Sequence, residues 1–587
     1  MIEYCPLYSR FKSRVGGVKA GHPLTVNILG EAHSATLVLT KEGEGHVPVY
    51  YDMDRFNDGF TVNLNITTCG LYFYYFLIDG VRYGSDEFLN LIVNGSDYLQ
   101  LVYEGSFRPL SGGVIYQIMP DRFYIEGKPN IKTGAKFQED WYAVPSHLPD
   151  ESGKYNNEFF GGNLQGIISK LDYLKDLGVT YIYLNPIFEA ASSHRYDTGD
   201  YEKIDSTLGT EEDFDSLVLE AKKRGIGIIL DGVFSHTGAD SKYFNRYGNY
   251  DTLGAYQSQS SLYYEWYSFN RYPNEYKCWW GFETLPEVNE ASPSYMDFML
   301  GSNGVIERWG RKGIVGWRLD VADELHSAFL DRLHSDTNVT LIGEVWENAA
   351  RKFAYGSRRS YFLGKQLDGV TNYPFKAGII EFLLTGDNTL LRKTLRELIN
   401  DYPSEVFLSM MNILGTHDTD RIITALSNDE RPQSKDERAE YTQSDIIEAA
   451  QRVKLASLIQ YILPGVPCLY YGDEAGLSGH EDPFCRKCYP WGNENAELIA
   501  HYKRLGEIRR QYASVFSGSC TDESPSNNVF KIVRSDGDIS LTLIVNLSGE
   551  DICEEGAFIP DNEAILVVKN VNKSQIFIYR HFCGDNK

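Results

Sequence analysis

Polar side chains that could carry out chemistry follow several short apolar segments in the middle of the chain. In chain order they are Asp231 with His236, Arg318 with Asp320, Glu344, and His417 with Asp418. Each apolar segment is typical of a buried β-strand. If these strands lie in parallel around one barrel, their carboxyl ends meet at one mouth and the side chains that follow them share one cleft. The spacing therefore predicts an active site assembled from four strands.

Paired carboxylates in a cleft without a metal indicate cleavage of a glycosidic bond. That reaction needs one ionised carboxylate as nucleophile and one carboxylic acid with a raised pKa to protonate the leaving oxygen. Arg318 would keep Asp320 ionised as the nucleophile, because a nearby cation favours the charged form of a carboxyl group. Glu344 would then be the acid and base, and Asp418 would stabilise the oxocarbenium-like transition state or hold sugar hydroxyls. Adjacent strands can supply the separation of about 5–5.5 Å that a retaining enzyme requires.

Each of these residues also has an ordinary structural interpretation. A single Asp at a strand end is more often a cap or an ion-pair partner than a reacting group, and we interpret Asp231 in this way, as a partner of Arg318. A metal centre is a second alternative, with ligands drawn from His236, Asp320, Glu344 and His417. Arg318 argues against the metal, because it lies on the same strand face as Asp320 and would place a fixed positive charge beside the cation.

Strands alternate with helical segments between residues 108 and 515, which predicts an α/β domain built as a (β/α)8 TIM barrel. The eight strand candidates are 114–119, 181–184, 226–233, 315–321, 340–346, 368–374, 411–415 and 466–472. Helical periodicity lies between most of them, including 163–178, 210–225, 305–313 and 445–463. Residues 237–302, after the third strand, are rich in Tyr, Trp and Asn and too long for a simple loop, so we expect an inserted subdomain there.

Two further β domains are expected to flank the barrel. Residues 1–107 contain short segments with alternating apolar and polar residues, separated by Gly, Asn, Asp and Ser. Residues 516–587 repeat this pattern. Many short strands with regular turns predict an antiparallel β-sandwich at each end of the chain.

The charge balance restricts the class of partner. The 587 residues include 56 Lys and Arg against 81 Asp and Glu, a net charge of −25, which repels phosphate backbones and anionic lipid. We therefore expect no nucleic acid and no membrane surface as a partner, whereas a neutral substrate fits.

The sequence has no apolar run of 18 residues and no apolar leader. Nine scattered cysteines disfavour a disulfide framework, so we expect a cytoplasmic protein.

Four motifs in order carry a resemblance to a known family. They are DGVFSH (231–236), GWRLDVAD (316–323), GEVW (343–346) and GTHDTDR (415–421). In order and spacing they resemble the α-amylase family of glycoside hydrolases, and LPEVN (285–289) is similar to that family's extra motif before the fourth strand. The likeness extends from about Tyr116 to Trp491. It is strongest to the cyclomaltodextrinase, neopullulanase and amylopullulanase branch, whose members often carry an N-terminal β domain.

The resemblance implies a role for each matching residue. It implies Asp320 as nucleophile, Glu344 as acid/base and Asp418 as transition-state stabiliser. It also implies contacts to the sugar being cleaved from Arg318, His236, His417 and an aromatic platform, Tyr196. It further implies substrate binding by Asp482 and Arg486 toward the non-reducing end, and by Trp346 and Glu347 toward the leaving group. The segment CWWGFETLPEVNE places Trp279 and Trp280 near the cleft, where Trp280 is a candidate substrate-binding residue; the alternative for both is a role in the core of the inserted subdomain.

Three departures concern metals. The family usually has Asn, often a calcium ligand, where this chain has Ser235. The loop that binds calcium in many relatives reads EGKPNIKTG here, with few carboxylates, and the Asp of its FFGGD motif is Asn163. We therefore expect no required cofactor and regard calcium as doubtful. The Cys485–Cys488 pair has no second C-x-x-C to complete a zinc site, so we interpret it as a structural loop.

The leading hypothesis is a retaining α-glucan hydrolase that cleaves α-1,4 bonds of malto-oligosaccharides, with cyclodextrins, pullulan and α-1,6 bonds as open additions. The nearest alternative is an α-glucan transglycosylase, since Trp279 and Trp280 could favour a sugar acceptor over water. A non-catalytic glycan-binding protein is the alternative of another class, and the intact set of acids argues against it. The N-terminal domain is expected to bind glycan or to form a homodimer.

Overall fold

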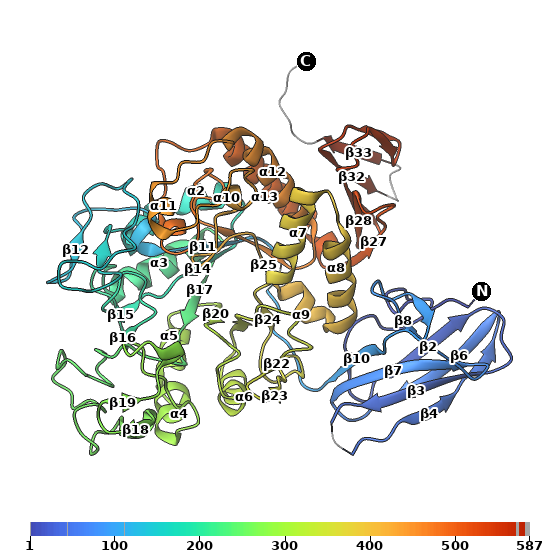
Figure 1. Cartoon of the computed structure of the whole chain (residues 1–587), viewed down its shortest axis with the longest axis horizontal. Helices are drawn as coiled ribbons and strands as arrows, with labels where there is room; N and C mark the ends of the chain where they lie inside the picture. Colours follow the sequence, from blue (N-terminus) through green and yellow to red (C-terminus); the bar gives the residue numbers. More distant parts are fainter. Residues whose placement is uncertain (1, 44, 111, 571–574, 581–587) are drawn as a thin grey trace.

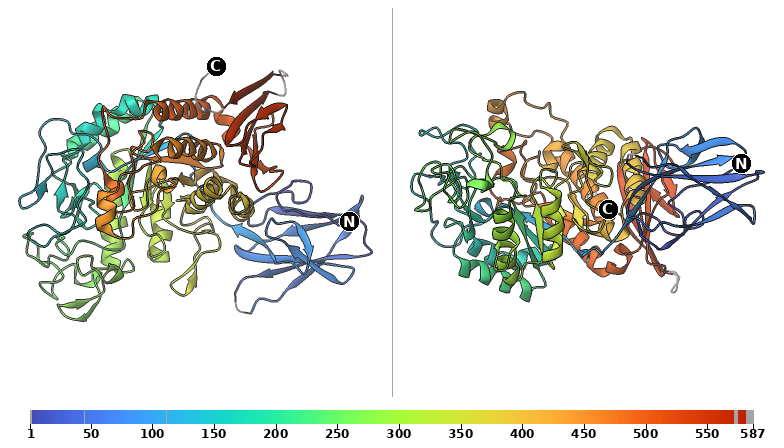
Figure 2. Two further views of the ribbon diagram at one scale, coloured as in Figure 1. Left: turned by 45° about the horizontal axis from the view of Figure 1, so that its top comes forward. Right: turned by 90° about the horizontal axis from the view of Figure 1, so that it is seen from below.

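The computed structural model describes residues 2–43, 45–110, 112–570 and 575–580. A central barrel carries a β domain at each of two places on its outer side, and an irregular green insertion lies at the end away from the N-terminal domain (Figure 1). The N-terminal domain lies at one end of the long axis in every view (Figures 1 and 2). None of the helices in the described part of the chain is long and apolar enough to span a bilayer.

The N-terminal domain is a sandwich of two sheets. The larger sheet holds β1 (Val18–Lys19), β3 (Ala35–Lys41), β4 (Val49–Asp52), β7 (Gly70–Ile78), β8 (Val81–Ser85), β9 (Leu91–Val93) and β10 (Tyr98–Tyr103), and the smaller holds β2 (Pro23–Leu29), β5 (Asp54–Phe56) and β6 (Gly59–Asn65). Alternate residues of these strands face a common core, in which Val26, Leu37 and Phe76 are at most 1% exposed. One pair departs from the predicted antiparallel arrangement, because β1 pairs with β10 in parallel.

The predicted barrel is confirmed. Its strands are β11 (Ile115–Ile118), β14 (Tyr181–Leu184), β17 (Gly227–Gly232), β20 (Gly316–Leu319), β21 (Thr340–Gly343), β24 (Gly369–Val370), β25 (Met411–Ile413) and β26 (Val466–Tyr470). All neighbours pair in parallel in the order β24-β21-β20-β17-β14-β11-β26-β25. A parallel bridge between Thr371 and Met411 closes the circle between the two ends of this order.

Helices surround the barrel. They are α1 (Leu164–Ser169), α2 (Leu171–Asp176), α3 (Glu211–Lys223), α5 (Val305–Arg311), α6 (Ser327–Asp336), α7 (Tyr373–Thr385), α8 (Thr389–Asp401), α9 (Ser404–Ser409), α10 (Ile422–Ala425), α11 (Lys435–Glu440), α12 (Ile446–Ile462), α13 (Ala496–Gln511) and α14 (Ala513–Phe516). The expected single helix over 163–178 is divided at Lys170 into α1 and α2. Helix α3 begins where its sequence predicts, because Thr210 and Asp213 form a reciprocal capping box.

The insertion after β17 is an aromatic unit with little regular structure. It contains β18 (Phe269–Arg271), β19 (Glu275–Tyr276) and α4 (Pro293–Leu300). The Trp266 ring lies 5.0 Å from Tyr295 of α4, and the Tyr295 hydroxyl donates to the carbonyl of Phe234 at the end of the third strand. The insertion therefore shares the apolar core of the barrel instead of forming a separate one.

The C-terminal domain is a smaller β unit. One sheet has the order β27 (Ser519–Asp522), β28 (Val529–Ser535), β29 (Ile539–Asn546), β32 (Glu563–Asn570) and β33 (Gln575–Arg580), all antiparallel, and β30 (Ile552–Glu554) pairs with β31 (Ala557–Ile559) beside it. Buried apolar residues on both faces of β29 attach the sheet to the barrel and to the small hairpin.

Helix α8 joins all three domains. The Arg396 side chain, 7% exposed, donates from Nε to the carbonyl of Phe88 in the N-terminal domain at 2.7 Å. Its Nη1 lies 3.4 Å from Asp522 of the C-terminal domain, and Arg392 of the same helix pairs with that carboxylate at 3.2 Å. A buried guanidinium held by partners from two domains ties both to the barrel.

Candidate active site

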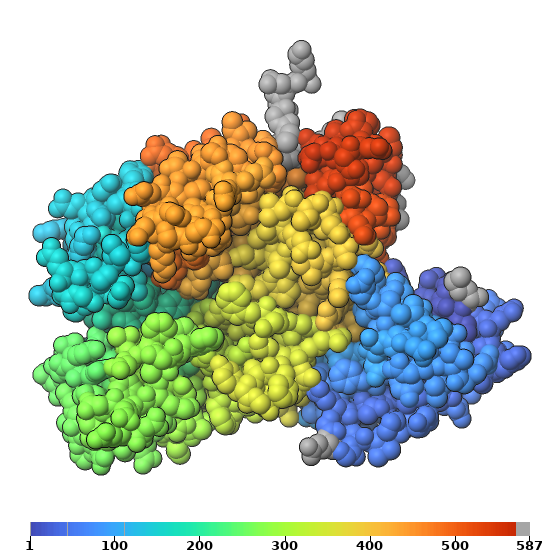
Figure 3. Space-filling model, viewed as in Figure 1, coloured from blue at the N-terminus to red at the C-terminus, as the bar shows by residue number. Residues whose placement is uncertain are grey.

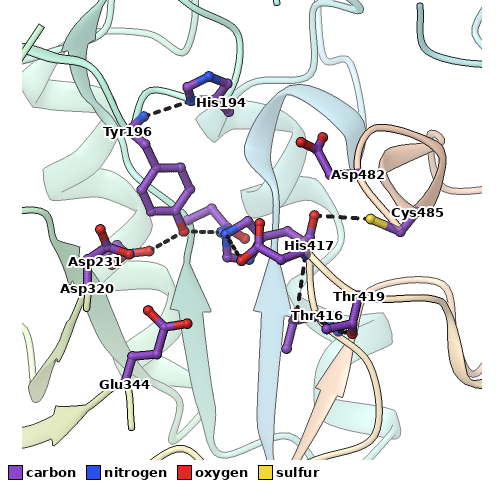
Figure 4. A network of polar contacts seen from close by, with 12 residues as sticks. His194, Tyr196, Asp231, Asp320, Glu344, Thr416, His417, Thr419, Asp482 and Cys485 are labelled. Carbon is purple, nitrogen blue, oxygen red and sulfur yellow. Dashed lines mark hydrogen bonds and ion pairs between the residues drawn. The ribbon is translucent and has the colours of Figure 1, made fainter. Parts of the chain in front are cut away.

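The strand register brings the predicted carboxylates together. In the barrel, Leu319 pairs with Gly343, so the next residues, Asp320 and Glu344, leave neighbouring strands at the same level. Asp231 on β17 pairs directly with Arg318 on β20. Figure 4 shows the side chains of Asp231, Asp320 and Glu344 near one another beyond the ends of the barrel strands, as expected for this fold.

One arginine connects three buried carboxylates. Nη1 of Arg318 lies 2.8 Å from both Asp231 and Asp320, and Nη2 lies 2.8 Å from Glu344. Asp231 also accepts hydrogen bonds from the hydroxyls of Tyr183 and Tyr196. Its oxygens are occupied by these partners, and its predicted position as a partner of Arg318 is confirmed.

The charges in this cluster do not balance. Three carboxylates face one guanidinium, and burial raises the pKa of Asp320 well above its ordinary value, with Glu344 adding to the effect and Arg318 opposing it. The sequence pattern shows the attraction to Arg318 but not the larger contribution of burial, which depends on the fold. Arg318 nevertheless remains the group that favours the ionised form of Asp320.

Glu344 is held by three donors. Its Oε2 accepts from Arg318 and from the backbone amide of Val321 at 3.0 Å, and its Oε1 accepts from the Tyr373 hydroxyl at 3.2 Å. Val321 has φ 40°, a region that β-branched residues rarely adopt. This strained residue, directly after Asp320, aims its amide at Glu344 and so couples the placement of the two acids.

The seventh strand places His417 and Asp418 opposite these acids. His417 Nδ1 lies 3.1 Å from the Gln117 amide nitrogen and Nε2 lies 3.1 Å from Asp418. Burial and Arg486 lower the pKa of His417 well below its ordinary value, so the ring is neutral and donates from Nε2. Arg486 holds Asp418 at 3.0 Å and Asp482 at 2.6 Å.

The predicted aromatic platform stands beside the seventh strand. The Tyr196 ring is stacked on His417, with centroids 5.0 Å apart and planes 3° apart. Its hydroxyl donates to Asp231, and Figure 4 shows the ring between His194 and the carboxylates.

Cys485 is buried and free, and its Sγ donates to the carbonyl of His417. The C-x-x-C segment therefore supports the loop that carries His417.

His236 is a buried histidine that follows the third strand. Its Nδ1 lies 3.0 Å from the Ser235 hydroxyl, whereas Nε2 is buried and has no hydrogen-bond partner among the described residues. Burial lowers the pKa of His236 to about 4. A neutral ring with one unsatisfied nitrogen suits a polar ligand such as a sugar hydroxyl. The Trp279 ring packs against it with centroids 5.4 Å apart.

The remaining predicted binding residues are more exposed. Trp346 is 50% exposed and stacks on Tyr373 with centroids 3.9 Å apart. Trp280 is 76% exposed, so the structure places it at the surface and not in the core of the insertion. The Glu347 side chain is 63% exposed and pairs with Lys352.

The family's calcium site does not fit this chain. Asn163 uses its amide oxygen as the cap of α1, accepting from the Gly166 amide, and its amide nitrogen donates to the carbonyl of Glu126. In the adjacent loop, the ammonium of Lys132 lies 2.6 Å from Asp205 and 3.3 Å from Glu189. A lysine beside these carboxylates supplies the positive charge there, in place of a cation.

A second acidic group is already neutralised by arginine. Among the described residues, Asp420, His480 and Glu481 converge closely enough to share an ion. Arg431 pairs with both carboxylates, and Arg438 pairs with Glu481. We interpret this group as an ion-pair network.

Activity should therefore survive a chelator. We expect kcat/KM after incubation with excess EDTA to stay within about twofold of the untreated value, because Lys132 and the Asn163 cap hold the loop without a cation. Assays before and after dialysis, with and without added CaCl2, measure this. A steep fall that calcium reverses would contradict our interpretation of the loop.

Sequence reasoning missed several contributors. Tyr373 lies in the segment NYPF (372–375), 29 residues after Glu344, and Gln117 lies in the first strand. Their types gave no signal, since a tyrosine or glutamine near a strand end is common. The amide of Val321 is a backbone contribution that side-chain patterns cannot reveal.

The site and fold define a class of protein. The chain matches the alpha amylase catalytic domain family over residues 117–522, and it belongs to the α-amylase family of glycoside hydrolases. It is 34% identical to a cyclomaltodextrinase of Geobacillus thermopakistaniensis, over 74% of this chain and 69% of that protein. It is 33% identical to an amylopullulanase of Thermoanaerobacterium saccharolyticum over 96% of this chain, yet spans only 48% of that protein's length.

A solved structure has a similar fold. The cyclic α-maltosyl-(1→6)-maltose hydrolase of Arthrobacter globiformis, in complex with that sugar, superposes with a TM-score of 0.67 at 28% identity. The superposition covers 79% of this chain and 100% of that one.

Proposed function

We propose that this chain is a retaining α-glucan hydrolase that cleaves α-1,4 bonds of malto-oligosaccharides. The observation that carries the proposal is the bridge from one Arg318 guanidinium to both Asp320 and Glu344, at 2.8 Å each. Two carboxyl groups on one planar group are close together, as the nucleophilic mechanism needs, whereas inversion requires room for a water between them.

In the first step, Asp320 attacks the anomeric carbon while the proton of Glu344 passes to the leaving glycosidic oxygen. The C–O bond to the leaving sugar breaks as the bond to the Asp320 oxygen forms. In the second step, water loses its proton to Glu344 and displaces the carboxylate, which regenerates both groups. In this proposal His236, His417 and Asp418 hold the hydroxyls of the reacting sugar.

The names of relatives suggest the substrate class. Cyclomaltodextrinase, amylopullulanase and the cyclic maltosyl-maltose hydrolase all refer to α-linked glucose. Incubation with maltotriose, maltoheptaose, β-cyclodextrin, pullulan and starch, followed by chromatography, tests the proposal. Glucose and maltose from the linear chains support it; panose from pullulan indicates α-1,4 cleavage and maltotriose indicates α-1,6. A folded chain that releases no product would favour the glycan-binding alternative.

Transglycosylation is the second candidate, and the exposed rings favour it. Trp280 and Trp346 are 76% and 50% exposed beside the site, so their faces can bind a sugar that competes with water in the second step. Products longer than the substrate, formed at high maltotriose concentration, would identify this activity.

The acidic limb of the pH profile should depend on Arg318. Asp320 reacts as the carboxylate, and its raised pKa means that the active form is lost as the pH falls through that value. In Arg318→Lys, the bidentate bridge is lost and the opposing attraction weakens, so the limb of kcat/KM should move to higher pH by about one unit. Initial rates across about pH 4–8, at the same ionic strength throughout, measure the shift. An acidic limb at the same pH in both enzymes would show that Arg318 does not influence the pKa of Asp320.

Association and location remain predictions. A homodimer formed through the N-terminal domain is proposed from the resemblance alone, and sedimentation of the full chain tests it. A cytoplasmic location, and glycan binding by the N-terminal domain, are also retained as proposals.

A further inference from the structure

Two exposed aromatic side chains from different segments share one carboxylate at the edge of the cleft. Trp280 Nε1 donates to Oε1 of Glu324 at 2.9 Å, and the Tyr355 hydroxyl donates to the same oxygen at 3.0 Å. The rings are 76% and 71% exposed, so their polar atoms are fixed while their faces stay open. Trp280 also packs on Trp279, with centroids 6.1 Å apart, and the Trp279 ring packs on His236. We call Trp280 and Tyr355 the acceptor pair, because a sugar acceptor would lie on their open faces.

Tyr355 occupies the tip of a short hairpin. The strands are β22 (Phe353–Ala354) and β23 (Ser357–Arg358), which pair in antiparallel fashion. Tyr355 and Gly356 form the two-residue turn with φ 50° and 77°, the left-handed pair that favours a tight hairpin. Because the turn contains only two residues, the position of the hairpin base determines where the Tyr355 ring lies.

The base of this hairpin is fastened to the N-terminal domain. Arg358 forms a bidentate ion pair with Glu42, with Nη2 2.6 Å from Oε1 and Nε 3.0 Å from Oε2. Glu42 directly follows β3, and its amide donates to the carbonyl of Leu71. Both charged side chains are about two-thirds buried, at 31% and 32% exposed. A bidentate pair of this kind fixes orientation as well as distance.

The residues after Arg358 hold the loop that follows the nucleophile. Arg359 Nη2 donates to the carbonyls of Asp323 and Leu325 at 2.6 and 2.7 Å, and the Tyr361 hydroxyl donates to the Asp323 carboxylate at 2.6 Å. In Figures 1 and 3, this yellow-green part of the chain lies between the green insertion and the blue N-terminal domain. It connects that domain physically to the loop that carries Glu324.

We propose that the N-terminal domain, within the same chain, fixes the leaving-group wall of the cleft through the Glu42–Arg358 pair. The acceptor pair on that wall binds the distal sugars of a long α-glucan, because flat rings with open faces suit the apolar faces of glucose units. Glu42 and Arg358 are positioning residues that touch no substrate. The inference rests on the proposed α-glucan activity and adds the means by which chain length is selected.

The test compares long and short substrates in variants of the pair. In Glu42→Gln, in Arg358→Gln and in the double variant, kcat/KM for maltoheptaose should fall by about 5- to 10-fold, because the hairpin is no longer held in place. If the acceptor pair binds distal sugars, the value for maltotriose, which has fewer glucose units to reach them, should stay within about twofold. The double variant should resemble Arg358→Gln, because that change already removes the ion pair, together with the donation from Arg358 to the carbonyl of Arg351.

Glu87→Gln is the matched control. It removes an ion pair between the N-terminal domain and Lys393 of α8, at 3.8 Å, away from the hairpin. This variant should keep the wild-type ratio of maltoheptaose to maltotriose. An unchanged ratio in Glu42→Gln, an equal fall for both substrates, or the same change in Glu87→Gln would each overturn the inference.

The outcome separates this inference from the proposed function. A folded wild-type chain that is inactive on both sugars would refute the hydrolase. In that case the readout would be the affinity for maltoheptaose, measured by tryptophan fluorescence, to which Trp280 contributes. Binding weakened in Glu42→Gln but not in Glu87→Gln would still support the wall; equal binding in all three would overturn it.

Discussion

Asp320→Asn should reduce turnover of maltoheptaose to below about 1% of wild type, because an amide cannot form the covalent intermediate. The amide keeps an oxygen that can accept from Arg318 Nη1, now at 2.8 Å from Asp320. Initial rates at high enzyme concentration, with product measured by chromatography, are the readout. Activity at or above a few per cent would remove Asp320 from the role of nucleophile.

The same substitution should not lower stability. Burial raises the pKa of Asp320, so above the unfolded-state pKa the ionised carboxylate costs free energy in the folded protein, and the neutral amide removes that cost. The thermal midpoint of Asp320→Asn at pH 7 should equal or exceed that of wild type. A lower midpoint would mean that the loss of activity reflects damage to the fold.

Glu344→Gln should be nearly inactive on malto-oligosaccharides, with a loss of about 10²- to 10⁴-fold, because it cannot protonate the leaving oxygen. The glutamine oxygen can still accept from Arg318 and from the Val321 amide, the partners of Oε2. Maltosyl fluoride needs no protonation to leave, so the first step should recover on that substrate. Comparing the ratio of rates on the fluoride and on maltotriose in both enzymes measures the effect.

The second step offers an internal control for Glu344. It requires a base to activate water, whereas azide attacks without one. Added azide should therefore accelerate Glu344→Gln on maltosyl fluoride and yield the glycosyl azide, while wild type responds little. An equal loss on both substrates, with no response to azide, would count against Glu344 as the acid and base.

The barrel and its acids could be predicted because their signals are local. Each strand is a short apolar run, and Asp320 and Glu344 follow two such runs directly, so barrel geometry alone brings them together. The interruption at Lys170 and the parallel pairing of β1 could not be foreseen, because both depend on packing with distant segments. Helical periodicity continues through Lys170, and the pairing of β1 with β10 involves only two residues on each strand.

The contacts that support the site could not be predicted from the sequence for a different reason. Glu324, Trp280 and Tyr355 meet only because an insertion and a hairpin converge on one loop. The raised pKa of Asp320 likewise depends on how deeply the site is buried. The sequence shows which charges are present, and the fold decides how much water remains around them.

Arg396 of α8 also has a consequence for synthesis on the ribosome. Its N-terminal partner, Phe88, is made long before it, whereas Asp522 emerges 126 residues later. Until then, Arg392 and Arg396 lack the carboxylate that neutralises them, and a guanidinium is costly to bury without one. The nascent barrel thus cannot close this face on its own. We expect vectorial folding to pause with α8 exposed until the domain that holds Asp522 is translated.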